Sequence, residues 1–420
     1  MRTKAVRLYG KKDLRLEEFE LPPIKDDEIL VRNVSDSICM STYKAAALGP
    51  DHKRVPKDVD RNPVIVGHES AGVIVQVGAK WKDRYREGAR FAIQPALNYK
   101  GSMDSPGYSY RHCGGDATYA IMPPEVMELD CLLEYSGDAF FQASLAEPMS
   151  CIVGAFHAAW HARPGSYEHE MGTKAGGRMA IVAGGGPMGL GAVDYALHSG
   201  RAPALLVVTD IDEGRLARAR ELFPAEKAAE SGTELLFVNT APLADPVASL
   251  RAMSDGAGFD DVFVFAPVAA AVEQGDRILG RDGCLNFFAG PTDTAFSARV
   301  NFYEVHYGAT HVVGTTGGNT DDMRESLALS SAGTINPAVM VTHVGGLDSA
   351  AEATLTLPDR PAGKKLVYVG VSMPMTAIAD FAELGRSDPR FERLHGLCAA
   401  ERGLWNADAE KYLLEAWPEI

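Results

Sequence analysis

The sequence predicts an α/β protein with two parts, a β-rich domain and a second domain built on a doubly wound, parallel six-stranded sheet. The chain has 420 residues, and a single hydrophobic core stops growing at roughly 250 to 300 residues, so two domains are expected. After Gly176, strand-like runs alternate with helical segments of about 10 to 15 residues, as in parallel sheets covered by helices on both faces. A glycine-rich turn follows the first of these strands.

The β-rich domain is expected from the first part of the chain. Short alternating or apolar runs are separated there by Gly and Pro, at 28–32, 71–78 and 90–95. Such period-two patterning with turn residues between the runs is typical of antiparallel sheets. A polar loop at 48–62, which contains Lys53 and Arg54, lies among them.

The parallel sheet is expected to use strands at 179–183, 205–209, 235–238, 262–265, 284–288 and 311–313, with helices from 187 to about 198 and at 215–222. Six is the number of strands expected of a dinucleotide-binding sheet. After about residue 332 the pattern is mixed again, with a strand at 365–369 and a helix at 408–416. We therefore expect residues 1–165 and 336–420 to form the β-rich domain, interrupted by the second domain at 166–335.

The charge of the chain excludes some partners. Lys and Arg number 41 and Asp and Glu 56, which gives a net charge of −15. Such a chain repels polyanions, so neither nucleic acid nor a membrane surface is an expected partner. A phosphorylated ligand would need a local group of cations.

The cysteines and the N-terminal segment indicate a cytoplasmic protein. Six cysteines are scattered without a C-x-x-C pair, which is typical of reduced thiols. The first residues lack the apolar stretch of a secretory signal, and no run reaches the roughly 20 apolar residues of a membrane span.

A cofactor site is predicted at the turn after the first parallel strand. Residues 184–189 fit the pattern G-x-G-x-x-G between a strand and a helix. The first glycine permits a tight turn, the second lets a diphosphate approach the backbone, and the third allows close helix packing. The helix N-terminus then offers free N–H groups to the diphosphate. The predicted cofactor-binding residues are Gly184, Gly186, Pro187, Met188 and Gly189.

The next strand supplies a candidate for cofactor choice. Asp210 follows Gly189 by 21 residues, where an acidic side chain accepts a hydrogen bond from a ribose 2′-hydroxyl and repels a 2′-phosphate. This predicts NAD(H) rather than NADP(H). Arg215 either lines the adenosine site or is an ordinary solvated helix arginine.

Three segments of the first domain carry candidate metal ligands, namely Cys39, His68 with Glu69, and Glu147. Cysteine, histidine and carboxylate are the ligand types that zinc takes, and a catalytic zinc keeps one position open. Zinc can polarise the carbonyl that accepts or loses a hydride. Each residue taken alone also has an ordinary interpretation, as a buried thiol, a hydrogen-bonded histidine or a solvated carboxylate.

Residues 67–78 resemble the G-H-E-x-x-G-x-V-x-x-V-G signature of zinc-dependent medium-chain dehydrogenases. Cys39 lies 29 residues before His68, where this family has its first zinc ligand. The resemblance covers nearly the whole chain and implies a GroES-like catalytic domain, a Rossmann domain and an NAD(P)-dependent oxidoreductase acting on CH–OH groups. It also implies a homodimer or homotetramer.

The resemblance implies one catalytic zinc, with Cys39 and His68 as ligands. The dipeptide at 147–148 is similar to the polyol and threonine dehydrogenase branch, so Glu69 and Glu147 remain alternatives for the third ligand and for a catalytic role. Family members with a structural zinc bind it through four closely spaced cysteines. In this chain the corresponding segment, residues 94–114, has a single cysteine, Cys113. We therefore expect no structural zinc.

Two further residues match a proton relay in part. Ser41 matches the hydroxyl that begins the relay of the family, and Lys44 stands where a histidine often completes it. A lysine can carry protons if burial or a metal lowers its pKa. Lys44 could instead bind an anionic group of the substrate, or be a solvated surface residue.

Several stretches are similar to the L-sorbose-1-phosphate reductase branch, at 8–16, 51–56, 93–98, 113–119 and 311–320. This resemblance implies reduction of a ketose 1-phosphate to D-glucitol 6-phosphate. Two alternatives are a dehydrogenase of a non-phosphorylated polyol or of threonine, and a non-enzymatic, crystallin-like protein. The candidate phosphate-binding residues, with the first two preferred, are Arg111, Lys44, Lys53, Arg54 and His112.

Overall fold

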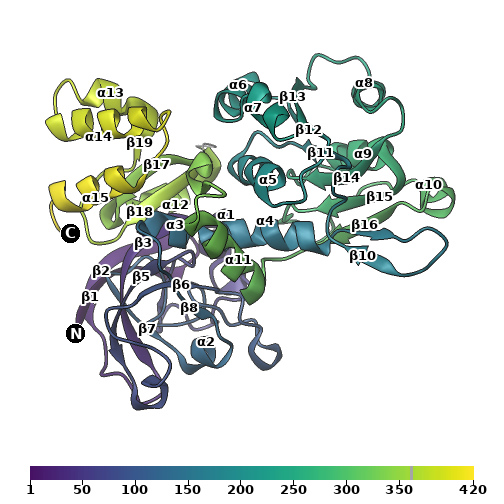
Figure 1. Ribbon diagram of the computed structural model, residues 1–420. Coiled ribbons are helices and arrows are strands. Elements are labelled where there is room, and N and C mark those ends of the chain that lie inside the picture. Colours follow the sequence, from purple (N-terminus) through teal and green to yellow (C-terminus); the bar gives the residue numbers. More distant parts are fainter. Residues whose placement is uncertain (360–362) are drawn as a thin grey trace. The chain divides into compact units, whose positions relative to one another are not determined.

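The computed structural model describes residues 1–359 and 363–420, which form two compact units (Figure 1). The first unit contains Met1–Glu147, Ser326–Ser331 and Val341–Ile420, and the second contains Pro148–Glu325 and Ala332–Met340. The chain thus leaves the first unit, builds the second and returns. The predicted α/β architecture is confirmed.

The first unit is organised around two mixed or antiparallel sheets in its described residues. The larger has eight strands in the order β19-β17-β18-β3-β5-β6-β8, with β7 paired to β3, and the smaller has the order β2-β1-β4. The strands are β1 (Arg2–Gly10), β2 (Asp13–Glu20), β3 (Ile29–Ile38), β4 (Val64–Ile65), β5 (Ala71–Val77), β6 (Arg90–Ile93), β7 (Tyr119–Met122), β8 (Leu132–Glu134), β17 (Val341–Gly346), β18 (Lys364–Tyr368) and β19 (Thr376–Ala377).

The helices of this unit lie in the loops between strands and in the C-terminal segment. They are α1 (Met40–Leu48), α2 (Pro124–Glu128), α3 (Phe140–Ser144), α12 (Leu347–Leu355), α13 (Phe381–Leu384), α14 (Pro389–Ala400) and α15 (Ala407–Ala416). The strand predicted at 365–369 and the helix predicted at 408–416 correspond to β18 and α15.

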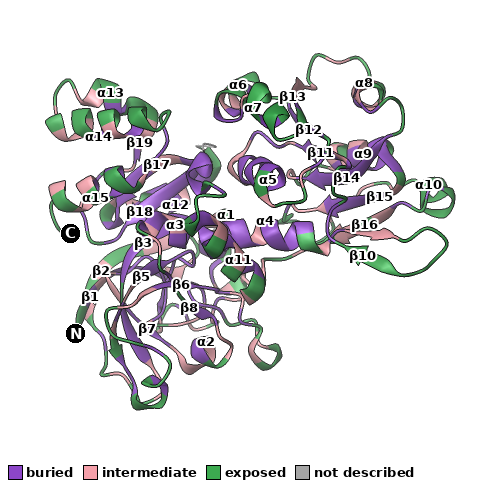
Figure 2. Ribbon diagram, in the orientation of Figure 1, coloured by how far each residue is buried: buried purple, intermediate pink, exposed green. Residues whose placement is uncertain are grey.

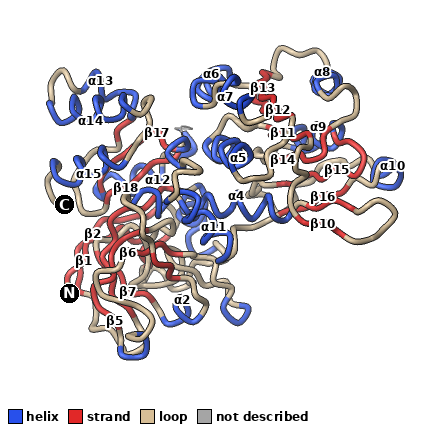
Figure 3. The backbone as a smooth tube through the Cα atoms, in the orientation of Figure 1, coloured by secondary structure: helices blue, strands red, loops and turns tan. Residues whose placement is uncertain are grey.

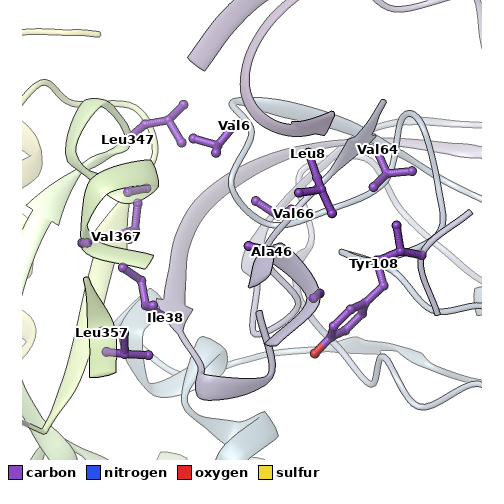
Figure 4. Packing of buried hydrophobic residues seen from close by; sticks show 14 of the residues in the cluster. Val6, Leu8, Ile38, Ala46, Val64, Val66, Tyr108, Leu347, Leu357 and Val367 are labelled. Carbon is purple, nitrogen blue, oxygen red and sulfur yellow. The ribbon is translucent and has the colours of Figure 1, made fainter. Parts of the chain in front are cut away.

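One core of this unit joins the two ends of the chain. Val6 and Leu8 of β1 pack in the same buried cluster as Leu347 of α12 and Val367 of β18 (Figure 4). Burying each such side chain stabilises the fold by about 1.5–3 kcal/mol. The returning segment is therefore part of this domain's core.

The pairing of β18 with β3 has a consequence for the site. The strands are antiparallel, and Lys365 is opposite Ile38. Because the strands run in opposite directions, this register places Lys364, the residue before Lys365, beside Cys39, the residue after Ile38.

The second unit contains a six-stranded parallel sheet in its described residues, in the order β13-β12-β11-β14-β15-β16. This is the strand order of a doubly wound dinucleotide-binding domain. The strands are β11 (Arg178–Val182), β12 (Leu205–Asp210), β13 (Glu234–Asn239), β14 (Phe259–Val264), β15 (Leu279–Phe287) and β16 (His311–Gly314), and a separate hairpin is made by β9 (Trp160–Ala162) and β10 (His169–Met171). Figure 2 shows the central strands as buried.

Helices alternate with these strands along the chain, as Figure 3 shows. They are α5 (Pro187–His198), α6 (Glu213–Leu222), α7 (Ala225–Glu230), α8 (Pro246–Met253), α9 (Ala269–Ile278) and α10 (Phe302–Tyr307), while α4 (Ala146–Ala158) and α11 (Thr320–Ser331) contribute residues to both units.

The main difference from the predicted elements is the start of β15. The strand begins at Leu279 rather than at Cys284, because it includes an irregular stretch in which Asp282 has a φ of +57°. The polar Arg281 and Asp282 interrupt the apolar pattern there, so the sequence shows only the regular second half.

All six cysteines lie in the described part of the chain and are free thiols, as expected. Within residues 1–359 and 363–420, no helix combines the length and the apolar character needed to cross a bilayer.

Candidate functional site

The first candidate ligand stands where a strand passes into a helix. Cys39 follows β3 and is the N-cap residue of α1, with extended backbone angles. A cysteine sulfur is one of the ligand types that zinc takes in proteins. The Sγ atom of Cys39 lies 3.6 Å from the Oγ atom of Ser41, in the first turn of α1.

His68 is held by a contact at each ring nitrogen. Its Nδ1 atom lies 3.2 Å from the Thr42 hydroxyl, and its Nε2 atom lies 3.2 Å from the hydroxyl of Tyr108. A partner at one nitrogen fixes the ring so that the other can bind a metal. Burial lowers the pKa of His68, so the ring is neutral, the form that binds a metal.

The glycine before His68 is required by close packing. Gly67 has a φ of +87°, and a Cβ atom there would lie 2.6 Å from the backbone nitrogen of Asp116. Only glycine fits this turn, which brings His68 and Glu69 towards β3.

One ligand atom each from Cys39, His68 and Glu69 lies within 4.8 Å of the others. A thiolate, an imidazole and a carboxylate are suitable donors for zinc, and three protein ligands leave one position open. The donor set therefore fits a catalytic zinc.

Glu69 is also half of a buried ion pair. The Nζ atom of Lys364 lies 2.5 Å from both carboxylate oxygens of Glu69, and the Ser37 hydroxyl also donates to this carboxylate. Burial raises the pKa of Glu69 to about 7, against the influence of Lys364. Burial alone would lower the pKa of Lys364, but the charges of Glu69 and Cys39 raise it above its usual range, so Lys364 is charged.

Glu147 lies in the first turn of α4 and is 8% exposed. Burial and the neighbouring charge of Glu69 raise its pKa, whereas His68 lowers it. Glu147 is thus close to the cluster but is not one of the three residues whose ligand atoms converge.

Sequence reasoning missed Lys364 and Tyr108. Lys364 begins a strand that is otherwise mostly apolar, and a buried lysine of this kind needs a carboxylate partner. Tyr108 is 2% exposed. Burial and Cys39 raise its pKa well above the usual value, while a hydrogen bond with Ser41 opposes the shift. Figure 4 shows its hydroxyl directed away from Val64.

The structure divides the five cationic candidates into two groups. Burial lowers the pKa of His52 to about 4, as do the nearby charges of Arg54, Lys53 and Lys44. Arg54 stacks over the Tyr108 ring, with 5.3 Å from Cζ to the ring centre. Lys44, Lys53 and Arg54 therefore lie together beside the metal-ligand cluster.

The other two candidates have different surroundings. His112 lies near Phe19, with 6.5 Å between ring centres, and Arg111 is its neighbour in the chain. Burial lowers the pKa of His112, and the positive charges of Arg111 and Arg7 lower it further. Over residues 1–359 and 363–420, neither Arg111 nor His112 forms a hydrogen bond or an ion pair with Cys39, His68 or Glu69.

Two buried carboxyl groups, those of Asp36 and Asp116, lie next to the segment that carries His68 and Glu69. Asp36 accepts hydrogen bonds from the backbone N–H groups of Ser37 and Glu69, at 2.8 and 2.9 Å. Asp36 and Asp116 are both buried and their carboxyl groups interact, while Asp36 Oδ2 and Asp116 Oδ1 accept no hydrogen bond from the described residues. Burial raises the pKa of Asp116 to about 7, and burial together with Asp116 raises that of Asp36 well above its usual value. Two carboxyl groups in contact need a proton between them.

This pair predicts an unusual pH dependence of stability. The native pKa values are raised, so the folded state holds a proton that the unfolded chain releases above about pH 4. The pair therefore stabilises the protein at low pH, and its contribution is lost as the pH rises through about 7. In Asp116→Asn, the slope of the unfolding free energy should change by up to about 1.4 kcal/mol per pH unit, the value for one proton.

Urea unfolding of Asp116→Asn and the wild type between pH 4 and 8 checks this. Asp60→Asn, a change of an exposed carboxylate, is the control and should keep the wild-type slope. An unchanged slope in Asp116→Asn would contradict the shared proton.

The glycine-rich turn lies between β11 and α5 as predicted, but its left-handed residue is Ala183, with a φ of +57°. A Cβ atom at Gly184 would lie 2.6 Å from Ile181 Cγ2, and one at Gly189 would lie 2.2 Å from the Gly184 carbonyl oxygen. Nothing lies within 4 Å of the corresponding position at Gly186. Gly184 and Gly189 therefore serve packing, and Gly186 leaves space for a ligand at the N-terminus of α5, after which Pro187 and Met188 begin the helix.

Asp210 ends β12 beside this turn. Its carboxylate accepts hydrogen bonds from the backbone N–H groups of Gly185, Ile211 and Asp212, at 2.9, 2.8 and 3.1 Å. These bonds fix the position of the Asp210 carboxylate next to the glycine-rich turn. The Cβ atom of Arg215 lies 2.9 Å from a Cβ position built at Gly185, so Arg215 also borders the turn.

Two family models match the chain. Residues 25–130 match the alcohol dehydrogenase GroES-like domain, and residues 187–332 match the zinc-binding dehydrogenase domain. Among solved structures, the chain is similar to 2R,3R-butanediol dehydrogenase from Bacillus subtilis, with a TM-score of 0.70 and 21% identity over 87% of this chain and 99% of that one. A zinc-binding dehydrogenase from Sinorhizobium meliloti 1021 bound to NADP has a TM-score of 0.69 at 20% identity, over 88% and 99% of the two chains.

Three relatives are identical to this chain at about half of the aligned positions. Mannitol-1-phosphate 5-dehydrogenase of Aliivibrio fischeri is 53% identical, over 98% of this chain and 97% of its own. L-sorbose 1-phosphate reductase of Klebsiella pneumoniae is 48% identical over the same shares. The uncharacterized protein YggP of Escherichia coli K12 is 56% identical, over 99% of this chain and 97% of its own.

Proposed function

The chain belongs to the zinc-binding, medium-chain alcohol dehydrogenase family, and we propose that it interconverts a ketose phosphate and a polyol phosphate, L-sorbose 1-phosphate and D-glucitol 6-phosphate. The observation that carries this proposal is full-length identity of 53% and 48% to two relatives that are both named for sugar or polyol phosphates. The donor set of Cys39, His68 and Glu69 supports the same chemistry.

One zinc per chain is part of the proposal. Cys39 and His68 would hold it, with Glu69 or Glu147 as the third ligand, and Cys113 stands without the neighbouring cysteines of a structural site. When bound, zinc polarises a carbonyl group as a Lewis acid. The buried Lys364 balances part of the negative charge that the thiolate and the carboxylates bring to the site.

The protein's own residues would handle the proton of the reaction. When a hydride adds to the carbonyl carbon, the carbonyl oxygen must take a proton. Ser41, next to Cys39, would donate this proton from its hydroxyl group. Lys44 lies one turn further along α1, and burial lowers its pKa, which favours its return of a proton to Ser41 directly or through water.

NADH is the proposed reductant. The N-terminus of α5 would bind the diphosphate, since its free N–H groups and partial charge suit an anion. Asp210 would accept from the ribose 2′-hydroxyl and repel a 2′-phosphate, while Arg215 beside the turn would stack near the adenosine.

The test is a substrate panel assayed by oxidation of NADH and of NADPH. The proposal predicts the highest kcat/KM with L-sorbose 1-phosphate and NADH. Free L-sorbose is the matched control without phosphate, and D-glucitol (sorbitol) and L-threonine are assayed in the oxidative direction by the reduction of NAD+ and NADP+. Faster turnover of free sorbitol or threonine would contradict the proposal in favour of a non-phosphorylated substrate. Absence of both turnover and zinc would indicate a non-enzymatic protein.

A homo-oligomer is the proposed assembly. The edge strand β16 is paired only with β15 among the described strands, and Val312 on it is 49% exposed. Phe302, Tyr303 and Tyr307 of α10 are also exposed. Exposed apolar groups of this kind mark protein interfaces. Analytical ultracentrifugation should give two or four times the 45.0 kDa of one chain, and a single-chain mass would contradict the proposal.

A further inference from the structure

Three cationic residues lie together on one side of the metal-ligand cluster. Lys44 lies on α1, while Lys53 and Arg54 lie in the loop that follows it. Their charges act together on His52, whose ring stacks on Tyr108 with 5.8 Å between centres. The charge of Arg54 also acts on His68 and Glu147. In an acidic chain, this is a local concentration of positive charge beside the candidate zinc ligands.

Arg54 is incompletely partnered within the fold. Its Nη1 atom lies 3.4 Å from the Ser105 hydroxyl, and its Nε atom is buried without a hydrogen-bond partner. In the described ranges, no carboxylate forms an ion pair with Arg54 or Lys53. A buried guanidinium donor without an acceptor is costly, and a bound anion would remove that cost.

Tyr108 connects Arg54 to the reacting end of the site. The guanidinium lies over the Tyr108 ring, and the hydroxyl of the same ring lies 3.2 Å from His68 Nε2. An anion bound by Arg54 is therefore about one tyrosine side chain away from the metal-ligand cluster. A separation of this size favours a phosphate carried close to the carbonyl.

The geometry points to Arg54, with Lys53 and Lys44, as the phosphate anchor of the site, and to 1-phospho-2-ketoses as the substrate class. This inference rests on the proposed function. The inference favours one of the two reactions for which the relatives are named. In L-sorbose 1-phosphate the ketone is adjacent to the carbon that carries the phosphate, as the inference requires. In mannitol 1-phosphate, carbon 5 is remote from the phosphate.

The first test needs no variant. D-fructose 1-phosphate and D-fructose 6-phosphate are the same ketose with the phosphate at opposite ends. The zinc-loaded wild type should show a kcat/KM at least about 10-fold higher for the 1-phosphate, the effect of about one charge-assisted hydrogen bond. Equal values, or a preference for the 6-phosphate, would overturn the inference.

The second test removes the charge. Arg54→Gln should lower kcat/KM for L-sorbose 1-phosphate by about 10- to 100-fold, mainly through KM, since one or two charge-assisted hydrogen bonds are lost. The same change should lower kcat/KM for free L-sorbose by a much smaller factor, because that substrate has no phosphate for Arg54 to bind. Arg54→Lys should recover part of the loss, and Lys57→Gln, in the same loop and exposed, is the control. Equal losses on phosphorylated and free sugar would contradict a phosphate anchor.

Calorimetric binding of D-glucitol 6-phosphate gives a readout independent of turnover. The affinity of the protein for D-glucitol 6-phosphate should fall in Arg54→Gln and should stay at the wild-type value in Lys57→Gln. Failure of the wild type to reduce any ketose phosphate would contradict the proposed function itself. Reduction of ketose phosphates with unchanged binding in Arg54→Gln would contradict only the anchor.

Discussion

Replacing Cys39 with serine is expected to abolish both zinc binding and turnover while NADH binding is retained. Cys39 Sγ is the thiolate of the converging ligand set, at the N-terminus of α1. Loss of even an outer partner of a metal ligand costs about 10- to 100-fold in activity or affinity, so Cys39→Ser should leave less than about 1% of wild-type kcat/KM. NADH binding should persist, because the glycine-rich turn belongs to the second unit.

Zinc content by mass spectrometry and NADH affinity by fluorescence titration check this expectation. Cys398→Ser, which changes a buried thiol on α14, is the control and should keep zinc and activity. Glu69→Gln and Glu147→Gln, compared in the same assay, identify the third ligand as the variant that loses zinc. Full zinc and full activity in Cys39→Ser would contradict the proposed metal site.

Replacing Lys364 with methionine is expected to lower the free energy of unfolding by about 3–5 kcal/mol, the usual effect of removing one partner of a buried ion pair. Lys364 and Glu69 are 6% and 0% exposed at their side chains. Without the ammonium group, the Glu69 carboxylate would keep Ser37 as a donor but would have no compensating charge. The measurement is urea unfolding at pH 8, above the pKa of about 7 that Glu69 has beside Lys364 in the wild type.

A double change separates this effect from a packing defect. Lys364→Met combined with Glu69→Gln removes both charges and should recover much of the lost stability, since no uncompensated charge remains. Lys80→Met removes an exposed partner of Glu128 and should cost no more than about 1 kcal/mol. A Lys364→Met protein as stable as the wild type would contradict the role of the buried pair.

Local patterns in the sequence predict the second unit well. The strands and the glycine-rich turn follow from apolar runs and from glycines that lie within a few residues of one another. The left-handed turn residue, Ala183, is the exception, because alanine gives no sequence signal for a positive φ. The start of β15 is missed for a similar reason, since polar residues interrupt the apolar run there.

The candidate site could be predicted only in part. Cys39, His68 and Glu69 lie in recognisable segments, and the structure brings their ligand atoms together. Lys364 could not be predicted, because its partner Glu69 is 295 residues away and the contact depends on the register of β18 against β3.

The choice among the cationic residues also required the fold. The sequence favours Arg111 and Lys44, both near segments with candidate ligands. In the structure, Arg54 rather than Arg111 stacks on Tyr108, beside His68. The position of Tyr108 depends on how the loop at 95–117 folds, and its sequence pattern does not determine this.

The transfer of hydride from the nicotinamide to a ketose phosphate is tested most directly by isotope tracing. The protein is incubated with L-sorbose 1-phosphate and NADH deuterated at carbon 4, separately on each face. We expect D-glucitol 6-phosphate with deuterium at the former carbonyl carbon from one of the two cofactors, and one NADH oxidised per product formed. Product without deuterium from either cofactor, or no product at all with zinc bound, would contradict the proposed reaction.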